Sequence, residues 1–303
     1  MPPSASTSAR LPEGRLRRLG GSTTVLLLAA ILLFGASWPA VKIALITTSA
    51  SPFWLAAVRS CLACLTLLIL RGGRLVRPAA ADAPALLAIG VLQLTAFFLC
   101  CHLAVRSVPA GQTAILSNAA LIWVVPLTAL FGQKEPALRW FAAMVTLCGV
   151  VVIVQPWAID WGELDSMAAY LALLVAAFAW ACTILVIRAR PPQLHVLELL
   201  PWSFAISACL LIALAMILEP TGGIPPGAWP VALFNGMIVA PFGTSCLIEL
   251  SRRLSPMIAT IAIMAIPLTG VLMGNFILGE RIGYDLICGG LLIALGMIMA
   301  SRS

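Results

Sequence analysis

Charged side chains are scarce in this sequence. Asp, Glu, Lys and Arg make up 10% of its 303 residues, whereas 62% of the residues are hydrophobic. A soluble domain carries about 25% charged residues, and a soluble chain this apolar would lack the polar groups needed to cover its surface. The composition therefore excludes an ordinary soluble protein and indicates that lipid surrounds most of the chain.

The sequence also lacks the residue sets that catalysis and metal binding need. It contains no nucleophile–base set, P-loop or paired carboxylates, and no acidic residue lies deep within a hydrophobic run. Cys61-x-x-Cys64 has the spacing of half a zinc site, but no second Cys or His pair accompanies it. We interpret the nine cysteines as packing residues. We predict that the protein is not an enzyme, holds no metal or other cofactor and forms no disulfide.

The net charge of +7 arises from basic residues that flank hydrophobic runs, so it does not indicate a nucleic-acid partner. If the N-terminus lies inside, 14 of the 18 Lys and Arg residues fall in inner segments. Outer loops carry Arg106 and Arg281, and two more basic residues, Lys42 and Arg59, lie within spans. The positive-inside rule then predicts a multi-pass membrane protein with both termini in the cytoplasm. Its expected partners are membrane lipid and a small-molecule substrate.

Long hydrophobic runs dominate the chain. Ten of them are long enough to cross the roughly 30 Å hydrocarbon core of a membrane as helices. The predicted spans are 23–46, 52–70, 83–105, 109–131, 138–156, 166–188, 194–218, 228–250, 256–278 and 283–301. Residues 1–22 form a polar, basic tail before them. A signal peptide over 15–37 is the alternative, but the uncharged run of Leu19–Val41 is too long for one, so we expect an uncleaved first span.

Two stretches, one in each half of the chain, resemble each other. Pro109–Glu135 and Pro256–Glu280 each contain a long uncharged run, an inner proline followed by Leu-Thr (Pro126 and Pro267) and a terminal acid. Such spans in corresponding places predict a duplicated, transporter-like membrane protein.

Each half contains five spans, and an odd number reverses the orientation of the second half. The halves are 23–156 and 166–301, joined by an acidic outer loop at 157–165. The predicted fold is therefore an all-α integral membrane protein with ten transmembrane helices in two inverted five-helix repeats.

Motifs in both halves add a family resemblance. They are LLFGASWPAVKIAL (Leu32–Leu45), Ser51-Pro52 followed by Arg59, Ala179-Trp180-Ala181, Pro267 before Gly279-Glu280, and Gly289-Gly290 with Gly296. In this order they resemble the bacterial drug/metabolite transporter superfamily, EamA type. The resemblance covers nearly the whole chain. It implies ten helices in two inverted repeats and export of small metabolites, and the chain looks most similar to the exporters of amino acids, aromatic ones included. The chain departs from this pattern in its first half, where Pro126 lies 9 residues before Glu135, whereas Pro267 lies 13 residues before Glu280.

Two cations inside spans are candidates for substrate contact. A lysine in a span costs roughly 2.5–3.5 kcal/mol at the bilayer centre. Lys42, one helical turn after Trp38, therefore either snorkels to the surface or lines an outer vestibule. Arg59 lies at a similar depth. Both cations can attract an anionic group of a substrate or pair with Glu280 or Asp285.

Amides and a histidine inside spans are further candidates. Gln93, Asn118 and Asn235 either hydrogen-bond between helices or bind the polar end of a substrate. His102, near the outer end of the third span, is either an interfacial histidine or a proton-coupling residue.

Aromatic and proline residues complete the candidate site. Trp38, Trp123 and Trp180 either pack within the bundle or line an apolar substrate pocket. Prolines inside spans free backbone carbonyls, so they can bend helices for gating or help to line a cavity. These prolines are Pro39, Pro126, Pro241 and Pro267.

Together these features predict an exporter of small zwitterionic or amphipathic metabolites, with amino acids, including aromatic ones, first. The expected mechanism is alternating access about a central pocket lined by spans one, three, four, six, eight and nine. The alternatives are a multidrug or other metabolite exporter (sugar or nucleoside type) of the same superfamily and, from another class, a non-transporting membrane scaffold or receptor. The sequence leaves the oligomeric state open and is compatible with a monomer.

Overall fold

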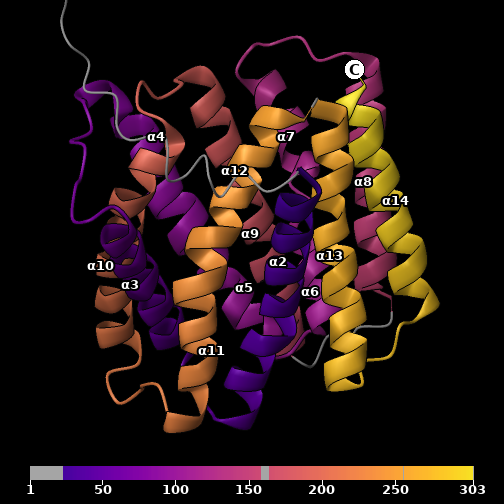
Figure 1. Ribbon diagram of the computed structural model, residues 1–303. Coiled ribbons are helices and arrows are strands. Elements are labelled where there is room, and N and C mark those ends of the chain that lie inside the picture. The colour runs from indigo at the N-terminus through magenta and orange to yellow at the C-terminus, as the bar shows by residue number, and fades with distance from the viewer. Residues whose placement is uncertain (1–22, 158–163, 255, 303) are drawn as a thin grey trace, which may run out of the picture.

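The computed structural model describes residues 23–157, 164–254 and 256–302. Over these residues it is a bundle of helices that run between two ends of the molecule (Figure 1). The start of α2 (Thr23–Thr47) and the end of α14 (Tyr284–Ser301) lie at one end, which we call the terminus side. The opposite end, where α2 ends, is called the distal side.

Each of the ten predicted spans coincides with a helix or with consecutive helical segments, to within three residues at either end. The first half contains α2, α3 (Pro52–Leu70), η1 (Ala80–Asp82), α4 (Ala83–Leu87), η2 (Ala88–Phe97), α5 (Phe98–Val105), α6 (Ala110–Ser117), α7 (Leu121–Leu130) and α8 (Ala137–Val154). The second half contains α9 (Leu164–Ala189), α10 (Val196–Leu218), η3 (Pro226–Ala228), α11 (Trp229–Leu233), η4 (Phe234–Gly243), α12 (Thr244–Arg253), α13 (Pro256–Leu278) and α14. Among the described residues there is no strand, which confirms the all-α prediction.

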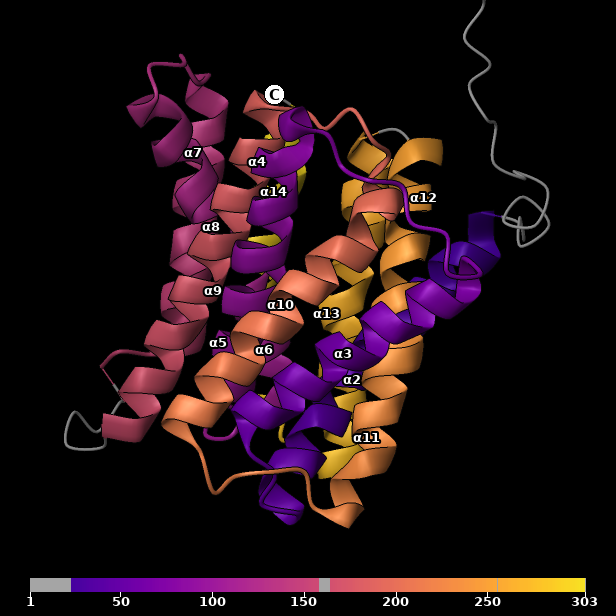
Figure 2. The ribbon, with the colours of Figure 1, turned by 90° about the vertical axis from the view of Figure 1, so that its left-hand side faces the viewer.

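The two halves run in opposite directions. The first half begins at the terminus side with α2, and the second begins at the distal side with α9 (Figures 1 and 2). Across the halves, α3 packs against α10 and α8 packs against α14. Each of these contacts joins equivalent helices, the second of each half and the fifth of each half. This is the arrangement of inverted five-helix repeats, as predicted.

The third span of each half contains a π-helix, at η2 in the first half and η4 in the second. π-helical turns are rare in proteins, and those that do occur often lie at functional sites. Gly236 at the start of η4 faces α3, where a Cβ built on it would lie 3.1 Å from the carbonyl oxygen of Arg59. The missing side chain lets η4 approach the α3 backbone, so the second half of the chain supports the segment that carries Arg59.

Helix α3 begins at a well-defined N-terminus. The side chain of Ser51 accepts a hydrogen bond from the backbone N–H of Trp54 at 3.1 Å, and Pro52 occupies the first helical position. Both features favour a helix start at this residue. Arg59 therefore lies about two turns into the helix from its distal end.

Glycines allow α8 and α14 to pack closely. A Cβ built at Gly296 would lie 2.6 Å from the carbonyl oxygen of Ala142, and one at Gly149 would lie 2.6 Å from the carbonyl oxygen of Gly289. Within lipid, the hydrophobic effect does not drive helices together, because the lipid tails are as apolar as the side chains. Helix association therefore depends on close packing of this kind. The contact between the fifth helices of the two halves thus requires glycine at these positions.

We expect Gly296→Val to destabilise the protein. The added atoms would meet the α8 backbone, which cannot yield without separating the helices, and overpacking typically costs about 1–3 kcal/mol. Gly290→Ala on the same helix is the control, since its Cβ would lie 3.2 Å from the end of the flexible Ile115 side chain. Thermal unfolding in detergent should show a lower Tm for Gly296→Val alone. Equal Tm values for both variants would contradict the close packing.

Candidate functional site

A small cavity lies between α2, α3 and α5. Two of its walls are helix faces with the spacing i, i+3, i+4, i+7. It is lined by Phe34, Ser37, Trp38 and Val41 of α2, Arg59 of α3, and Phe98, Cys101, His102 and Val105 of α5. Its volume of about 20 Å³ accommodates a water molecule but is far below the roughly 300–1,000 Å³ of small-molecule sites. The structure is therefore closed around this cavity.

Arg59 places a positive charge in the cavity wall. Its side chain is 3% exposed, and its guanidinium carbon lies 3.7 Å from the centre of the Phe98 ring. Among the described residues, no carboxylate pairs with this guanidinium and no acceptor hydrogen-bonds to it. A cation–π contact compensates a buried charge only in part. An anionic group in the cavity would supply the missing partner.

The sequence left two outcomes open for Arg59, pairing with an acid or attraction of a substrate anion. In the structure Glu280 pairs with Lys42 instead, at 2.9 Å between Nζ and Oε1. The sequence offered Arg59 as one of two possible anion contacts, but the second span was not among the predicted pocket-lining spans. The available signal was a single arginine interrupting an otherwise apolar span.

His102 lies one helical turn from Phe98 and is 4% exposed. Its ring interacts with the backbone of Pro52, at the start of α3. The Nδ1 atom is buried and has no hydrogen-bond partner among the described residues. A neutral imidazole with its proton on the other nitrogen presents Nδ1 as an acceptor. In that tautomer the histidine contributes an unused acceptor to the wall that contains Arg59.

Trp38 also lines the cavity, whereas Asn235 lies behind it. The hydroxyl of Ser37, a lining residue, donates to Oδ1 of Asn235 at 2.5 Å. Asn235 is 2% exposed and donates to the carbonyl of Val231 at 3.3 Å. Asn235 thus connects the cavity wall on α2 to η4 of the second half.

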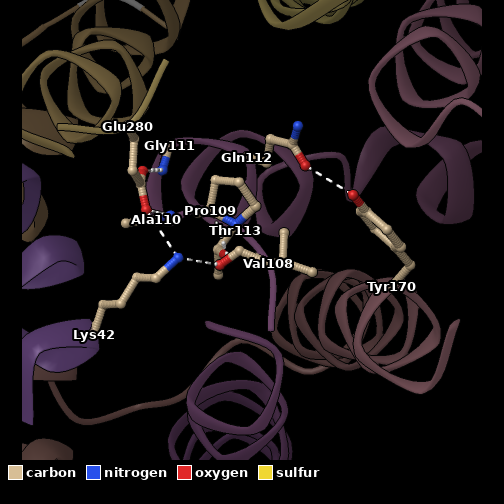
Figure 3. Close-up of polar contacts among 9 residues, drawn as sticks. All are labelled: Lys42, Val108, Pro109, Ala110, Gly111, Gln112, Thr113, Tyr170 and Glu280. Atoms are coloured by element: carbon tan, nitrogen blue, oxygen red, sulfur yellow. Dashed lines mark hydrogen bonds and ion pairs between the residues drawn. The ribbon is translucent and has the colours of Figure 1, made fainter. Parts of the chain in front are cut away.

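Lys42 belongs to a polar cluster at the distal side (Figure 3). Besides its ion pair with Glu280, its ammonium donates to the carbonyl of Val108 at 3.0 Å. The Glu280 carboxylate accepts the backbone N–H groups of Ala110 at 2.8 Å and Gly111 at 3.3 Å, at the N-terminus of α6. A carboxylate is favourable at this helix end. We call this cluster the distal latch, because it joins α2 and α6 of the first half to the end of α13 in the second.

A second distal contact joins the halves at the start of α3. The Ser51 hydroxyl donates to the Glu219 carboxylate, and the Trp54 indole N–H donates to the Glu219 carbonyl at 3.0 Å. Burial raises the pKa of the Glu219 carboxyl, and the nearby Arg106 lowers it to a lesser degree. The distal side is therefore closed by contacts on α3 as well as on α6.

The terminus side is closed around a buried aspartate. Asp82 accepts backbone N–H groups from Ala79 at 2.9 Å, Gln193 at 2.7 Å and Leu194 at 3.0 Å. Gln193 and Leu194 connect α9 to α10, so one carboxylate joins the two halves. Polar contacts thus link the halves at both ends of the bundle, with the cavity between them.

The remaining predicted residues lie outside the cavity wall. Trp180 packs at 4.9 Å from Phe97, Trp123 packs at 5.3 Å from Phe178, and both distances join ring centres. Asn118 donates to the Ala114 carbonyl at 2.8 Å, where the helix is interrupted between α6 and α7. Gln93 is half-buried in η2. Their role in substrate binding stays a prediction.

The predicted helix-bending prolines lie within helical segments. Pro39 is buried in α2 next to Trp38, Pro126 is in α7, Pro241 is in η4 and Pro267 is in α13. Pro241 coincides with a π-helix, so the helix is irregular at that proline. A gating role for the four prolines stays a prediction.

Comparisons with known proteins agree with this architecture. The model of the EamA-like transporter family matches residues 21–155 and 167–302. The uncharacterized transporter YoaV of Bacillus subtilis is 23% identical over 63% of this chain and 66% of its own length. An uncharacterized transporter of Clostridium kluyveri is 22% identical over 69% of either chain. A solved structure described as "Crystal structure of protein" has a TM-score of 0.59 at 21% identity and covers 93% of this chain and 99% of its own; it supports the fold alone.

Proposed function

The chain belongs to the EamA-like transporter family, and from this premise we propose that it exports small amphipathic or zwitterionic metabolites across the bacterial inner membrane. Amino acids, aromatic ones included, are the proposed first substrates. The family is one of multi-pass membrane transporters, so a small-molecule substrate and a lipid environment follow from membership. Which molecule is carried is the subject of the proposal.

The observation that carries this proposal is the unpaired cation in an aromatic cavity. The Arg59 guanidinium has five N–H donors and can bind a carboxylate through two parallel hydrogen bonds. Phe34, Trp38 and Phe98 supply aromatic surface in the same cavity, and such surface favours an apolar or aromatic group. The chemistry of the wall thus fits a small carboxylate with a hydrophobic side chain.

Alternating access is the proposed mechanism. The cavity is too small for an amino acid in this closed state, so the helices around it must move apart to admit one. In an inverted-repeat transporter, rocking of the two halves would supply that movement. We propose that the contacts of Asp82 open toward the cytoplasm and that the distal latch opens toward the exterior. In this scheme Lys42 belongs to the exterior gate, and the four span prolines allow the helices to bend.

The proposed orientation places the terminus side in the cytoplasm, since basic residues concentrate in the segments on that side. Export then runs from the terminus side to the distal side. A monomer contains one complete cavity, because α2, α3 and α5 all come from one chain. His102 stays the candidate for proton coupling.

Uptake by proteoliposomes tests the proposal. We expect saturable uptake of labelled phenylalanine and tryptophan, exceeding that of threonine, because the cavity wall is aromatic. Methionine should be intermediate, and protein-free liposomes are the control. Uptake without a pH gradient would indicate a facilitative carrier, whereas uptake only with a gradient would make His102 the next residue to mutate. No uptake of the four amino acids would contradict the amino-acid proposal and direct the search to other metabolites and drugs.

A further inference from the structure

Two buried polar groups of the cavity wall lack partners, one an anion and the other a hydrogen bond. The Arg59 guanidinium is a cation without an anionic partner among the described residues, and His102 Nδ1 has no hydrogen-bond partner there. With the ring proton on Nε2, Nδ1 is an acceptor without a donor. Both side chains are more than nine-tenths buried and both line the same cavity. A ligand that satisfies them must offer an anion and a hydrogen-bond donor.

The His102 ring interacts with the backbone of Pro52, the first residue of the helix that carries Arg59. Nδ1 has no hydrogen-bond partner among the described residues, so we assign the contact with Pro52 to Nε2. This contact therefore holds the imidazole against α3, in the wall that contains Arg59, and leaves Nδ1 available to a ligand.

We propose that Arg59 and His102 Nδ1 together bind the α-amino-acid group of the substrate, an inference that rests on the proposed function. The substrate carboxylate accepts hydrogen bonds from Arg59, and the adjacent ammonium donates to His102 Nδ1. The substrate side chain then lies against Trp38 and Phe34. The same Nδ1 lone pair cannot accept from an ammonium group when it carries a proton, so His102 is neutral while substrate is bound.

Other occupants satisfy only one of the two groups. A water molecule can donate to Nδ1 but leaves the Arg59 charge without a counter-ion. A simple carboxylate neutralises Arg59 but brings no donor for Nδ1. A simple amine donates to Nδ1 but adds a second positive charge beside Arg59, which is repulsive. A zwitterion with both groups on one carbon meets both needs.

A ligand series measures the two contacts separately. We would measure displacement of labelled phenylalanine from the purified full-length protein by phenylalanine, by 3-phenylpropanoate, which lacks the ammonium, and by phenethylamine, which lacks the carboxylate. The cost of opening the cavity is common to the three ligands and cancels in their ratios. For the wild-type protein we expect phenylalanine to bind about 10- to 100-fold more tightly than 3-phenylpropanoate, as for loss of a charged hydrogen bond.

Two substitutions of His102 separate ligand binding from the contact with Pro52. In His102→Gln the side-chain amide reaches the position of Nε2, so it retains a donor toward Pro52 but removes the Nδ1 acceptor. In His102→Asn the side-chain oxygen takes the position of Nδ1, so it retains the acceptor and removes the contact with Pro52. We expect His102→Gln to bind phenylalanine no more tightly than 3-phenylpropanoate, and His102→Asn to retain most of the preference.

The outcomes distinguish this inference from the proposed function. If His102→Gln retains the wild-type preference for phenylalanine, or if only His102→Asn loses it, His102 acts through Pro52 and the inference is wrong although the transporter still carries amino acids. If the wild-type protein binds 3-phenylpropanoate as tightly as phenylalanine, the ammonium contact is absent and the inference is likewise wrong. If labelled phenylalanine does not bind to the wild-type protein at all, the proposed amino-acid function fails first.

Discussion

Arg59→Gln is expected to reduce the initial rate of phenylalanine uptake into proteoliposomes about 100-fold or more. The substitution removes the positive charge of the cavity wall, and loss of a buried charged partner typically costs 2–5 kcal/mol of binding. The rate would be normalised to the amount of reconstituted protein. Because the guanidinium has no acidic partner among the described residues, no protein carboxylate loses its partner in this variant.

Stability separates a binding role of Arg59 from a structural one. Replacing an uncompensated buried charge by a neutral side chain is often neutral or stabilising, so the Tm of Arg59→Gln should equal or exceed that of the wild type. Arg59→Lys is the matched control, since it retains the charge without the bidentate geometry, and it should retain intermediate uptake. Normal uptake by Arg59→Gln would exclude Arg59 from the substrate site, and a large fall in Tm would show that the arginine supports the fold.

Glu280→Gln is expected to open the distal side. It removes the ion pair with Lys42 and weakens the cap on the N-terminus of α6. Hydrogen bonds to charged groups contribute about 1.5–3 kcal/mol, so the distally open population should rise about tenfold or more. Cys101 reports on this change because it lines the cavity and is 1% exposed in the closed structure.

The measurement uses protein in which Cys101 is the sole cysteine. A membrane-impermeant thiol reagent applied from the distal side should label Cys101 faster in Glu280→Gln than in its parent. Glu135→Gln is the matched control. Glu135 ends the corresponding stretch of the first half and pairs with Arg139 within that half at 2.7 Å, so its loss should leave labelling unchanged. Equal labelling rates in the parent and both variants would show that the distal latch does not close the cavity.

The ten helices could be predicted from the sequence because each crosses the membrane as one long apolar run. The opposite direction of the halves followed from the odd number of spans in each half, and the helices of Figure 2 run accordingly. The hydrophobic pattern did not reveal the π-helices at η2 and η4, since a change from α to π turns leaves an all-apolar segment all-apolar. Hydropathy alone therefore predicts the spans but not their internal irregularities.

The site could be predicted only in part. Trp38 and His102 were candidates by residue type and depth, and both line the cavity. The partners of Lys42 and Arg59 could not be assigned, because both cations lie at similar depths and sequence distance does not decide which of them meets Glu280. The close packing of α13 against α2 decides which cation meets Glu280. A Cβ built on Gly270 of α13 would lie only 3.1 Å from the Trp38 ring of α2. That contact brings the two helices together on the face that carries Lys42, and leaves Arg59 to the cavity.

A structure of the protein with bound 4-bromophenylalanine tests the central claim most directly, because the anomalous signal of bromine locates the ligand independently of the protein map. The account predicts a bromine peak beside Trp38 and Phe34, with the ligand carboxylate within hydrogen-bond distance of Arg59. A bromine peak elsewhere in the bundle, with the Arg59 guanidinium still over Phe98 and without an anion, would contradict the assignment of this cavity as the substrate site.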